Sequence, residues 1–393
     1  MQNLKVLLSH NFYRQPGGED RVFAAEGAML EQNGHVVLRH EDQNDRIRRG
    51  AMEAASDVVW SRHTFQHLDA LARSTSIDIA HFHNTFPLIS PAAYYAVRRA
   101  GVPVVQTLHN FRLICPGGAL NRNALVCELC LERESLLPAI AHSCYRDSRP
   151  ATIALTAMLA FHRAAGTYRR QIDTYIALSE FARRKFIDGG LPADRIVVKP
   201  NFVIPDPGSG SDKGRGGYAL FVGRLAKEKG IRTLIDAWRS LQDIPLQVAG
   251  DGPLNQASWP YGITWLGAQP RHRVMTLMQD AEILVFPSTS YECAPMTIIE
   301  AFACGLPVIA SNLGSIPEFV QHRYNGLLFS PGDPADLARQ VRWAFDHPEE
   351  LRAIRANARH EFEQKYTAER NYKMLMAVYK TAIGHMNGSP ASD

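Results

Sequence analysis

The stretch Ser288–Ser311 has the sequence STSYECAPMTIIEAFACGLPVIAS and leads from one strand through a helix to the next strand. The apolar run before it ends at Pro287, and Pro295 suits the first turn of a helix over 295–303. A second apolar run, 308–311, follows as the next strand. A strand, a helix and a strand joined by short loops are the repeating unit of a parallel sheet, so this stretch decides for an α/β fold.

The same alternation extends over almost the whole chain. It predicts two doubly wound, Rossmann-like parallel-sheet domains that face each other across a cleft. The segment 201–217 is rich in Gly, Pro and Ser and is expected to be a linker, and 384–393 is expected to fray. The predicted strands are 4–9, 35–39, 79–83, 104–108, 174–178, 196–199, 218–222, 246–249, 264–267, 283–287 and 308–311. The predicted helices are 20–33, 232–242, 271–279, 295–303, 334–347, 349–366 and 367–383.

The size and composition fit a soluble globular protein. The 393 residues suffice for two or three domains, and the 46% hydrophobic and 21% charged residues exclude bulk disorder. A net charge of +4 is too balanced to make nucleic acid the expected partner, although residues 1–200 hold 24 basic and 19 acidic residues. Neither a signal peptide nor an apolar run of membrane-spanning length is present in the sequence, which predicts a cytoplasmic location.

Two carboxylates flank the start of the helix predicted over 295–303. Glu292 precedes this helix and Glu300 lies inside it. The backbone N–H groups of 294–297 are expected to be unpaired and to form an anion site of the kind that phosphates use. The carboxylates themselves suit sugar hydroxyls, which can donate hydrogen bonds to them. The alternative interpretation is a solvated pair of glutamates beside an ordinary core helix.

A second block, YALFVGRLAKEKG at 218–230, carries two cations. The predicted strand ends at Gly223, which allows a close approach of the backbone. Arg224 and Lys229 follow within one short loop and match the two negative charges of a diphosphate. A plain turn with basic surface residues is the alternative.

Near the N-terminus, Gly17-Gly18 precedes a helix and suits either a phosphate or a simple turn. Glu19 and Asp20 follow, where they stabilise the start of the helix or orient an acceptor hydroxyl.

Histidines stand at the ends of two predicted strands. His81 and His83 occur in HFHN, before Asn84, and His109 occurs in TLHN. Strand ends aimed at a cleft favour a functional role, and a structural role is the alternative.

Taken together, these motifs resemble the retaining nucleotide-sugar glycosyltransferases of the GT-B fold, in particular glycosyltransferase family 4. The resemblance covers nearly the whole chain. Its most specific element is the E-x7-E motif of Glu292 and Glu300 with the following AFACGLPVIAS, and FVGRL-x-x-EKG is the second. Further matching motifs are the GG and TLHN motifs, ALSEFARRKF at 177–186, KPNFVIP at 199–205, AGDGP at 249–253 and LG at 266–267.

The resemblance implies a role for each matching residue. The catalytic residues would be Glu292, His109, Arg224 and Lys229, with the two cations stabilising the leaving diphosphate. Glu300 would bind the ribose hydroxyls, Glu292 would hold the transferred sugar, and the base would rest near 265–269. The implied donor-binding residues are Gly18, Gly223, Arg224, Lys229, Gly267, Glu292, Ala294, Pro295, Met296, Thr297 and Glu300. The acceptor-side candidates are Glu19, Asp20, His83 and Asn84.

The implied reaction moves a hexosyl or deoxyhexosyl group, with retention of configuration, from a nucleoside-diphosphate sugar to a glycan or lipid-linked acceptor. Cell-surface polysaccharide synthesis (exopolysaccharide, capsule or lipopolysaccharide) is the expected setting, and no catalytic metal is expected. Residues 1–205 and 367–393 would form the acceptor-side domain, and 206–366 the donor-binding domain. Cys293 departs from the family, which commonly has Gly there, and we expect the bulkier side chain to narrow the sugar pocket. The alternatives are a nucleotide-sugar epimerase or phosphorylase and a zinc-containing nucleic-acid-binding protein.

Four cysteines lie within 30 residues of one another, in a segment (112–148) that is not part of the general family pattern. One pair has the two-residue spacing of zinc knuckles, so we expect a structural zinc that pins this insertion beside the acceptor side of the cleft. Buried reduced thiols and disulfides are the alternatives. The four cysteines are Cys115, Cys127, Cys130 and Cys144.

The basic excess of the first half suggests contact with the inner face of the cytoplasmic membrane, where a lipid-linked acceptor would lie. A solvated helix face is the alternative. The candidate residues are Arg46, Arg48 and Arg49, and Arg163, Arg169 and Arg170 behind the apolar stretch 151–161.

Overall fold

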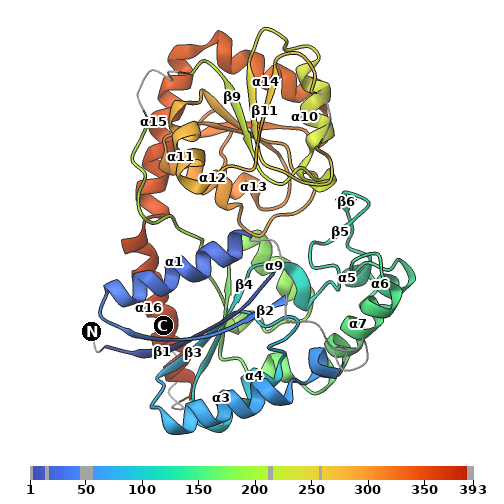
Figure 1. The fold of residues 1–393 in the computed structure, drawn as a ribbon, viewed down its shortest axis with the longest axis vertical. Helices are drawn as coiled ribbons and strands as arrows, with labels where there is room; N and C mark the ends of the chain where they lie inside the picture. The colour runs from blue at the N-terminus through green and yellow to red at the C-terminus, as the bar shows by residue number, and fades with distance from the viewer. Residues whose placement is uncertain (1–2, 14–16, 45–55, 211–215, 256–258, 387–393) are drawn as a thin grey trace. The chain divides into compact units, whose positions relative to one another are not determined.

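The computed structural model describes residues 3–13, 17–44, 56–210, 216–255 and 259–386 and divides into two compact units (Figure 1). Unit 1 comprises Met1–Leu120, Glu128–Pro200 and Asn371–Asp393, and unit 2 comprises Asn121–Cys127 and Asn201–Arg370. Each unit is built on one six-stranded parallel sheet, so the predicted pair of Rossmann-like domains is confirmed. Residues 211–215 of the predicted linker, and Arg46, Arg48 and Arg49, lie outside the described residues.

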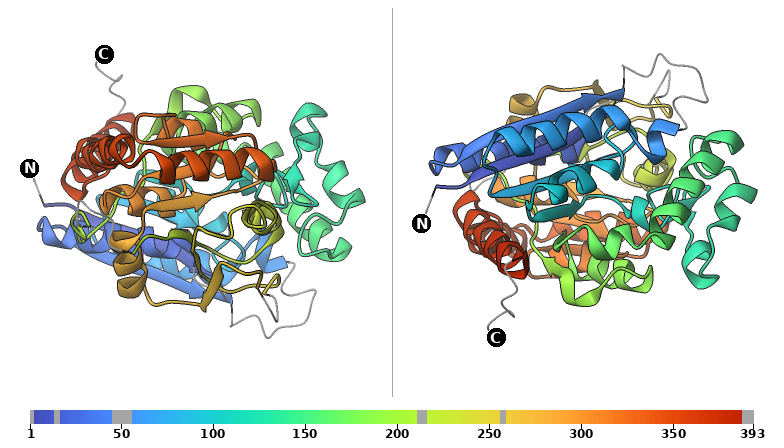
Figure 2. Two further views of the ribbon diagram at one scale, coloured as in Figure 1. Left: turned by 90° about the horizontal axis from the view of Figure 1, so that it is seen from above. Right: turned by 90° about the horizontal axis from the view of Figure 1, so that it is seen from below.

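In unit 1 the strand order is β2-β1-β3-β4-β7-β8. The strands are β1 (Lys5–Phe12), β2 (Val36–Gln43), β3 (Ile79–Asn84), β4 (Val104–Leu108), β7 (Thr174–Ala177) and β8 (Ile196–Val198). The main helices are α1 (Gly18–Gln32), α3 (Arg62–Ser74), α4 (Ala92–Arg99), α7 (Arg149–Ala164), α9 (Glu180–Asp188) and α16 (Ala368–Met386). Because the chain runs from β1 to β2 in one direction and from β2 through β3 to β4 in the other, α1 lies on one face of the sheet and α3 and α4 lie on the other (Figures 1 and 2).

The core of unit 1 forms around β1 and β3. Val6, Leu7 and Leu8 of β1 are fully buried, as expected for a parallel strand covered on both faces. Helix α1 places Phe23 and Leu30 in the same core. The carboxyl ends of β1 and β3 meet where the strand order changes direction, and this point is a ligand position in doubly wound sheets.

The last helix, α16, packs on unit 1. Its Tyr372 hydroxyl lies 2.9 Å from His35 Nε2, and its Tyr379 hydroxyl lies 2.9 Å from His81 Nδ1. The helix continues to Met386, so the predicted fraying from Gly384 onward is wrong for 384–386. The terminal position of α16 suggested a frayed end, but the helix is held in place by its packing on unit 1.

In unit 2 the strand order is β11-β10-β9-β12-β13-β14. The strands are β9 (Ala219–Val222), β10 (Leu246–Ala249), β11 (Ile263–Gly267), β12 (Ile283–Phe286), β13 (Val308–Ser311) and β14 (Gly326–Phe329). The helices are α10 (Ile231–Trp238), α11 (Arg271–Asp280), α12 (Met296–Ala303), α13 (Ile316–Phe319), α14 (Pro334–Asp346) and α15 (Pro348–Lys365). Trp238 is fully buried at the centre of the core, where its indole N–H donates to the carbonyl of Ile244 at 2.9 Å. The order changes direction between β9 and β12, which makes this the second switch point of the molecule.

The insertion has more structure than its composition suggests. A short hairpin joins β5 (Asn121–Arg122) to β6 (Leu125–Val126), and α5 (Leu129–Glu132) and α6 (Leu137–Ala141) follow. These elements are two to five residues long, too short to give a periodic signal in the sequence. Among the helices that the structure describes, none has the length and apolar character needed to cross a membrane.

Candidate functional site

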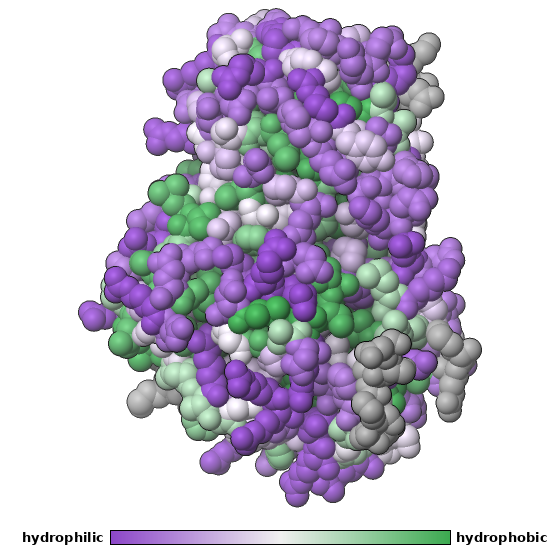
Figure 3. Space-filling model, turned by 180° about the vertical axis from the view of Figure 1, so that it is seen from behind, coloured by the Kyte–Doolittle hydropathy of each residue, from purple (hydrophilic) through white to green (hydrophobic). Residues whose placement is uncertain are grey.

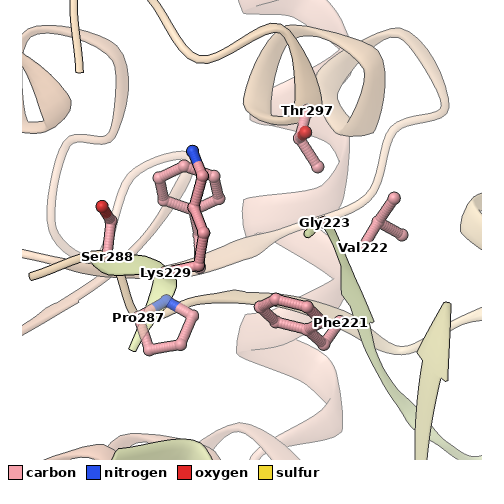
Figure 4. Close-up of a pocket in the computed structure, with 8 residues that line it drawn as sticks. Phe221, Val222, Gly223, Lys229, Pro287, Ser288 and Thr297 are labelled. Carbon is pink, nitrogen blue, oxygen red and sulfur yellow. The ribbon is translucent and has the colours of Figure 1, made fainter. Parts of the chain in front are cut away.

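A pocket opens in unit 2 where the strand order changes direction. β9 and the loop after β12 form most of its wall, and α12 closes one side (Figure 4). The residues that line it are Phe221, Val222, Gly223, Lys229, Phe286, Pro287, Ser288 and Thr297. The sequence-predicted residues Gly223, Lys229 and Thr297 therefore come together in one pocket.

Lys229 is the cation of this pocket. Its Nζ donates to Glu292 Oε1 at 2.6 Å, and the Ser288 hydroxyl donates to the same oxygen at 3.1 Å. The side chains of Lys229 and Glu292 are 28% and 18% exposed, so solvent reaches both. An anionic ligand can therefore approach the ammonium group without unfolding any element.

Gly230 explains how Lys229 reaches this place. A Cβ added to Gly230 would lie 1.8 Å from the carbonyl oxygen of Pro287, and its φ of 72° is in the left-handed region. Only glycine permits this approach, because an L side chain would clash with the backbone that follows β12. The 3-10 turn η4 (Lys227–Lys229) is thus held against the pocket, with the amide of Thr289 donating to the carbonyl of Glu228 at 2.9 Å.

Gly223 and Arg224 follow β9 directly. A Cβ added to Gly250 would lie 1.9 Å from the Gly223 carbonyl oxygen, so the two backbones touch where β9 and β10 end. Arg224 is exposed and pairs with Glu228, four residues later. The two predicted cations therefore occupy the same loop, and each is held by a glutamate.

Helix α12 carries three further members of the predicted donor set, Met296, Thr297 and Glu300. Glu300 is only 1% exposed, and its Oε1 lies 3.8 Å from Arg271 Nε. Pro295 is the N-cap, followed by Met296 and Thr297 in the first turn, whose N–H groups have no carbonyl within the helix. The helix therefore presents the positive end of its dipole at the pocket where Thr297 lies.

The loop between Glu292 and α12 is fixed by its neighbours. The Ser315 hydroxyl donates to the Glu292 carbonyl at 2.6 Å, and the Asn201 amide donates to the Ala294 carbonyl at 3.4 Å. Cys293 is buried. That its thiol narrows the sugar pocket stays a prediction.

Gly267 ends β11 with a φ of 71°, which glycine adopts without strain. Beside it, the half-exposed Trp265 donates its indole N–H to the Gly250 carbonyl at 2.9 Å. This contact joins the segment predicted for the base to the loop that follows β10.

In unit 1, Glu19 and Asp20 lie in the first turn of α1. Asp20 accepts the backbone N–H of Gly17 at 2.7 Å and lies 2.7 Å from His10 Nε2, so it caps the helix. Glu19 accepts the Asn110 amide at 3.3 Å. Burial, and then the charge of Asp20, raise the pKa of Glu19 to about 7. A carboxyl with such a pKa can exchange a proton near neutral pH, which suits contact with a hydroxyl.

His83 and His109 form a direct pair, with His83 Nδ1 2.9 Å from His109 Nε2. Burial lowers the pKa of both imidazoles, to about 4 for His83. Asn84 differs from this pair, since its amide donates to the Asn11 carbonyl at 2.8 Å and its oxygen accepts the amide of Phe86 at 3.0 Å. The backbone contacts of Asn84 indicate a structural use of its amide group.

Sequence reasoning missed the buried ion pair of Glu26 and Lys199. Lys199 Nζ donates to Glu26 Oε2 at 3.0 Å, and the two side chains are 2% and 1% exposed. Glu26 lies on the apolar face of α1 together with Phe23 and Leu30, and Lys199 follows the apolar strand β8. A charged residue on an apolar face was the signal that could have revealed this pair.

The cysteines of the insertion lie in short local elements. Cys115 follows the 3-10 turn Phe111–Leu113, and Cys144 follows α6. A Cβ added to Gly117 would lie 3.7 Å both from Cys115 Sγ and from Cys144 Cβ, so the two outer cysteines approach the same glycine. Within the described part of the chain, only Glu26, His81 and His83 form a group of three or more metal-ligand atoms lying within 4.8 Å of one another.

Comparisons with known proteins agree with the geometry of both units. The model of "Glycosyltransferase Family 4" matches residues 16–206, and that of "Glycosyl transferases group 1" matches residues 209–361. The chain is 35% identical over 166 residues to a putative teichuronic acid biosynthesis glycosyltransferase of Bacillus subtilis, covering 42% of each chain. It is 29% identical over 307 residues to the 2-deoxystreptamine glucosyltransferase of Streptomyces kanamyceticus, covering 74% of this chain and 73% of that relative.

Solved structures show the same fold. The Anabaena protein HepE in complex with UDP superimposes with a TM-score of 0.67 at 17% identity, covering 96% of this chain and all of that one. Several curated relatives match over less than half of their own length, between 42% and 48%. The matches named here support neither an epimerase nor a nucleic-acid-binding protein.

Proposed function

Since the chain belongs to the family 4 glycosyltransferases of the GT-B fold, we propose that it transfers a hexosyl or deoxyhexosyl group from a nucleoside-diphosphate sugar to a glycan or lipid-linked acceptor, with retention of configuration. The observation that carries this proposal is the pocket of unit 2, where Lys229, Glu292 and the start of α12 come together at the switch point. This set offers a cation and helix N–H groups for the diphosphate of a nucleotide sugar, and a carboxylate that accepts hydrogen bonds from sugar hydroxyls.

In the proposed reaction, the ammonium of Lys229 exchanges its contact with Glu292 for the donor diphosphate. Glu292 then turns both carboxylate oxygens to hydroxyls of the transferred sugar. Arg224 adds a second cation, and the buried Glu300 accepts the ribose hydroxyls. The acceptor oxygen forms its bond to the anomeric carbon on the face from which the diphosphate leaves, and the leaving phosphate takes up the acceptor proton. As the bond to the diphosphate breaks, negative charge grows on it, and cations already in position stabilise this charge without reorganisation.

A thermal-shift screen with UDP, GDP and dTDP tests the donor site. A nucleotide at 100 times its dissociation constant should stabilise the fold by about 2.7 kcal/mol. UDP is the first choice because the structurally similar Anabaena protein is known with UDP and with UDP-glucose. If none of the three nucleotides shifts the melting temperature, the proposal for this pocket fails. Retention is tested by the anomeric configuration of the product in an NMR spectrum.

Cell-surface polysaccharide synthesis is the setting that we propose. The relatives named for teichuronic acid and amylovoran biosynthesis support this setting. A mass-spectrometric comparison of surface glycans from cells with and without the active chain tests it, and unchanged glycans would exclude it.

We also propose that α7 touches the inner face of the membrane. Its exposed side includes Ile153 and Phe161, and the exposed Arg169 and Arg170 follow closely. Apolar residues reach the surface among hydrophilic ones elsewhere too (Figure 3), so the arginines are the more specific feature. Flotation with vesicles that contain anionic lipid should recover the chain, and the double variant Arg169→Ser/Arg170→Ser should lose this binding. Equal recovery with neutral vesicles would contradict the charge contribution.

We further propose that the insertion holds a structural zinc. No three of the four thiols lie within 4.8 Å of one another in the described structure, so zinc would have to draw them together. The observation in favour of the site is that Cys115 and Cys144, 29 positions apart in the sequence, both approach Gly117. Metal analysis of the purified chain should find one zinc per molecule, and Cys144→Ser should lose it. The matched control is Cys304→Ser, since burial raises the pKa of Cys304 to about 12 and disfavours a thiolate ligand. Absence of zinc from the unmodified chain would exclude the site.

A further inference from the structure

A continuous chain of hydrogen-bonding groups crosses the interior of unit 1 and ends at His109. We call Glu26, His83 and His109 the histidine chain. Glu26 Oε1 lies 3.1 Å from His83 Nε2, and His83 Nδ1 lies 2.9 Å from His109 Nε2. Glu26 is on α1, His83 ends β3 and His109 follows β4. Three elements thus meet through side chains at the carboxyl edge of the sheet.

The first member of the chain, Glu26, is ionised. Lys199 Nζ donates to its Oε2 at 3.0 Å, and His81 Nδ1 lies 3.0 Å from its Oε1. Burial alone would raise the pKa of Glu26, but the Lys199 ammonium and the hydrogen bonds from His81 and His83 outweigh it and hold that pKa well below its usual range. A carboxylate accepts hydrogen bonds and donates none. Each nitrogen that faces Glu26 must therefore carry a proton.

This condition fixes the orientation of the second member, His83. Its Nε2 faces the carboxylate and carries the N–H, and burial holds its pKa at about 4, so the ring has a single proton near neutral pH. Its Nδ1 is then an acceptor. The proton in the 2.9 Å contact to His109 must therefore belong to His109 Nε2.

The third member, His109, is left with one defined acceptor. Burial lowers its pKa well below the usual value, so the ring is neutral with its proton on Nε2. Its Nδ1 has no hydrogen-bond partner among the described residues, and the side chain is half-buried. An outside group that meets this nitrogen must donate a hydrogen bond to it, as a hydroxyl does.

We infer that Glu26 and His83 are positioning residues that hold His109 in the Nε2–H tautomer, so that its Nδ1 accepts a hydrogen bond from a sugar hydroxyl. His109 then acts as a neutral acceptor, neither as an acid nor as a cation beside the diphosphate. This role in sugar binding rests on the proposed function. The tautomer itself follows from the contacts inside unit 1.

The same contacts argue against a metal at Glu26, His81 and His83, although their ligand atoms lie within 4.8 Å of one another. The Lys199 ammonium, 3.0 Å from Glu26, already supplies the positive charge that a metal would bring. A second cation at this distance in a buried site would be repelled. The charge of Glu26 is thus balanced by Lys199, and the two imidazoles of His81 and His83 donate hydrogen bonds to it.

The test is the ring nitrogen spectrum of the full chain labelled with 15N-histidine, recorded at pH 7 by long-range 1H–15N correlation. The signal of His109 is assigned by its loss in His109→Gln. We expect a protonated Nε2 and an unprotonated Nδ1. A protonated Nδ1, whether in the other neutral tautomer or in an imidazolium, would overturn the inference.

Glu26→Gln makes a second, sharper test. Lys199 can only donate, so the amide oxygen of the glutamine must face it and the NH2 group must face His83. His83 Nε2 then becomes the acceptor, and the proton of His109 should move from Nε2 to Nδ1. An unchanged His109 tautomer in a folded Glu26→Gln chain would also overturn the inference. If this variant does not fold, the spectrum of the unmodified chain still decides.

Thr107→Val is the matched control. Thr107 Oγ1 lies 2.8 Å from His81 Nε2, in the same network but outside the histidine chain. This variant should keep the His109 tautomer and the rate of UDP release from UDP-glucose, whereas Glu26→Gln should lower that rate at least about tenfold. A lowered rate with an unchanged tautomer would contradict the positioning role. If no UDP is released by any form, the proposed function fails while the tautomer is still measured.

Discussion

Each unit has its own parallel sheet with one switch point, and each has a Lys–Glu ion pair. The pair is open to solvent in one unit and buried in the other. In unit 2, Lys229 pairs with Glu292 where solvent reaches both side chains. In unit 1, Lys199 pairs with Glu26, and both side chains are almost completely buried. The buried pair has a further hydrogen bond, because the side-chain oxygen of Asn371 accepts one from Lys199 Nζ at 2.9 Å.

The difference in solvent exposure suits the two ion pairs to different tasks, ligand binding in unit 2 and the positioning of side chains in unit 1. An accessible cation can change partners when a ligand arrives, because water weakens its attraction to the first partner and no helix or strand has to move. A buried and fully hydrogen-bonded pair cannot change partners cheaply, but it fixes the side chains around it. We therefore expect unit 2 to lose ligand binding when its pair is broken, and unit 1 to lose stability.

The largest effect is expected for Lys199→Met. This change leaves the carboxylate of Glu26 buried without its ammonium partner, which should cost about 3–5 kcal/mol of unfolding free energy. Lys229→Met is the matched control in the accessible pair and should cost about 1 kcal/mol or less. Urea denaturation of both variants measures the difference. Equal losses would show that burial does not distinguish the two pairs.

The fold of both units could be predicted from the sequence because apolar runs and helical patterns alternate so regularly. Strand β14 was missed, since its four residues GLLF form a short run between polar loops and gain their identity by pairing with β13. Helices α3 and α4 were also missed. Both nevertheless place buried residues at helical spacing, Thr64, Leu68 and Ala72 in α3 and Ala93, Ala96 and Val97 in α4, so the amphipathic period was present in the sequence and was overlooked.

The second prediction concerns catalysis in unit 2. Lys229→Ala removes the cation proposed to meet the growing charge of the diphosphate and should lower kcat about 100-fold with UDP-glucose as donor. Lys227→Ala removes the same charge two residues away, from an exposed side chain that is not among the residues lining the pocket, and should keep kcat within about twofold. Steady-state rates of UDP release measure both. An equal loss in the two variants would show that only the net charge of the loop matters.

The site was predictable only in part, and the reason lies in the same comparison. Arg224, Lys229, Glu292 and Glu300 stand in short, recognisable motifs, so the sequence singles them out as candidates for the donor site, and Lys229 is the one of them that lines the pocket of unit 2. Glu26 and Lys199 are 173 residues apart, and only the folded sheet brings them together. The sequence marks where a charge is unusual, but it does not give the distant partner that neutralises it.

The third prediction uses pH to single out Glu19, a carboxyl of unit 1 outside the buried ion pair whose pKa is raised by burial. Its folded pKa of about 7 is above the ordinary 4.5, so its stabilising contribution is fully present below pH 4.5 and is lost as the pH rises through 7. Glu19→Gln stays neutral and should gain about 1–3 kcal/mol relative to the unmodified chain between pH 5 and pH 8.

Urea denaturation at the two pH values gives this difference directly. The lowered pKa values of His83 and His109 act in both proteins and cancel in the comparison. The matched control is Glu180→Gln, because that glutamate is exposed on α9 and should change nothing between the two pH values. Parallel pH dependence of Glu19→Gln and the unmodified chain would mean that Glu19 is not held protonated by the fold.

The smallest effect is expected for Glu228→Gln, which changes a second accessible ion pair in the loop that carries Lys229. The carboxylate of Glu228 holds the exposed Arg224, while its backbone carbonyl accepts the amide of Thr289 and is unaffected by the change. The free energy of unfolding should therefore stay within about 0.5 kcal/mol of the unmodified chain.

The same change should strengthen the binding of UDP. With the carboxylate of Glu228 gone, Arg224 has one competitor fewer for a diphosphate, so the Kd for UDP should fall about twofold to fivefold. Isothermal titration at low and high salt measures this. The gain should shrink at high salt, because screening weakens an exposed charge most, and a gain independent of salt would place Arg224 in a more enclosed site than its exposure indicates.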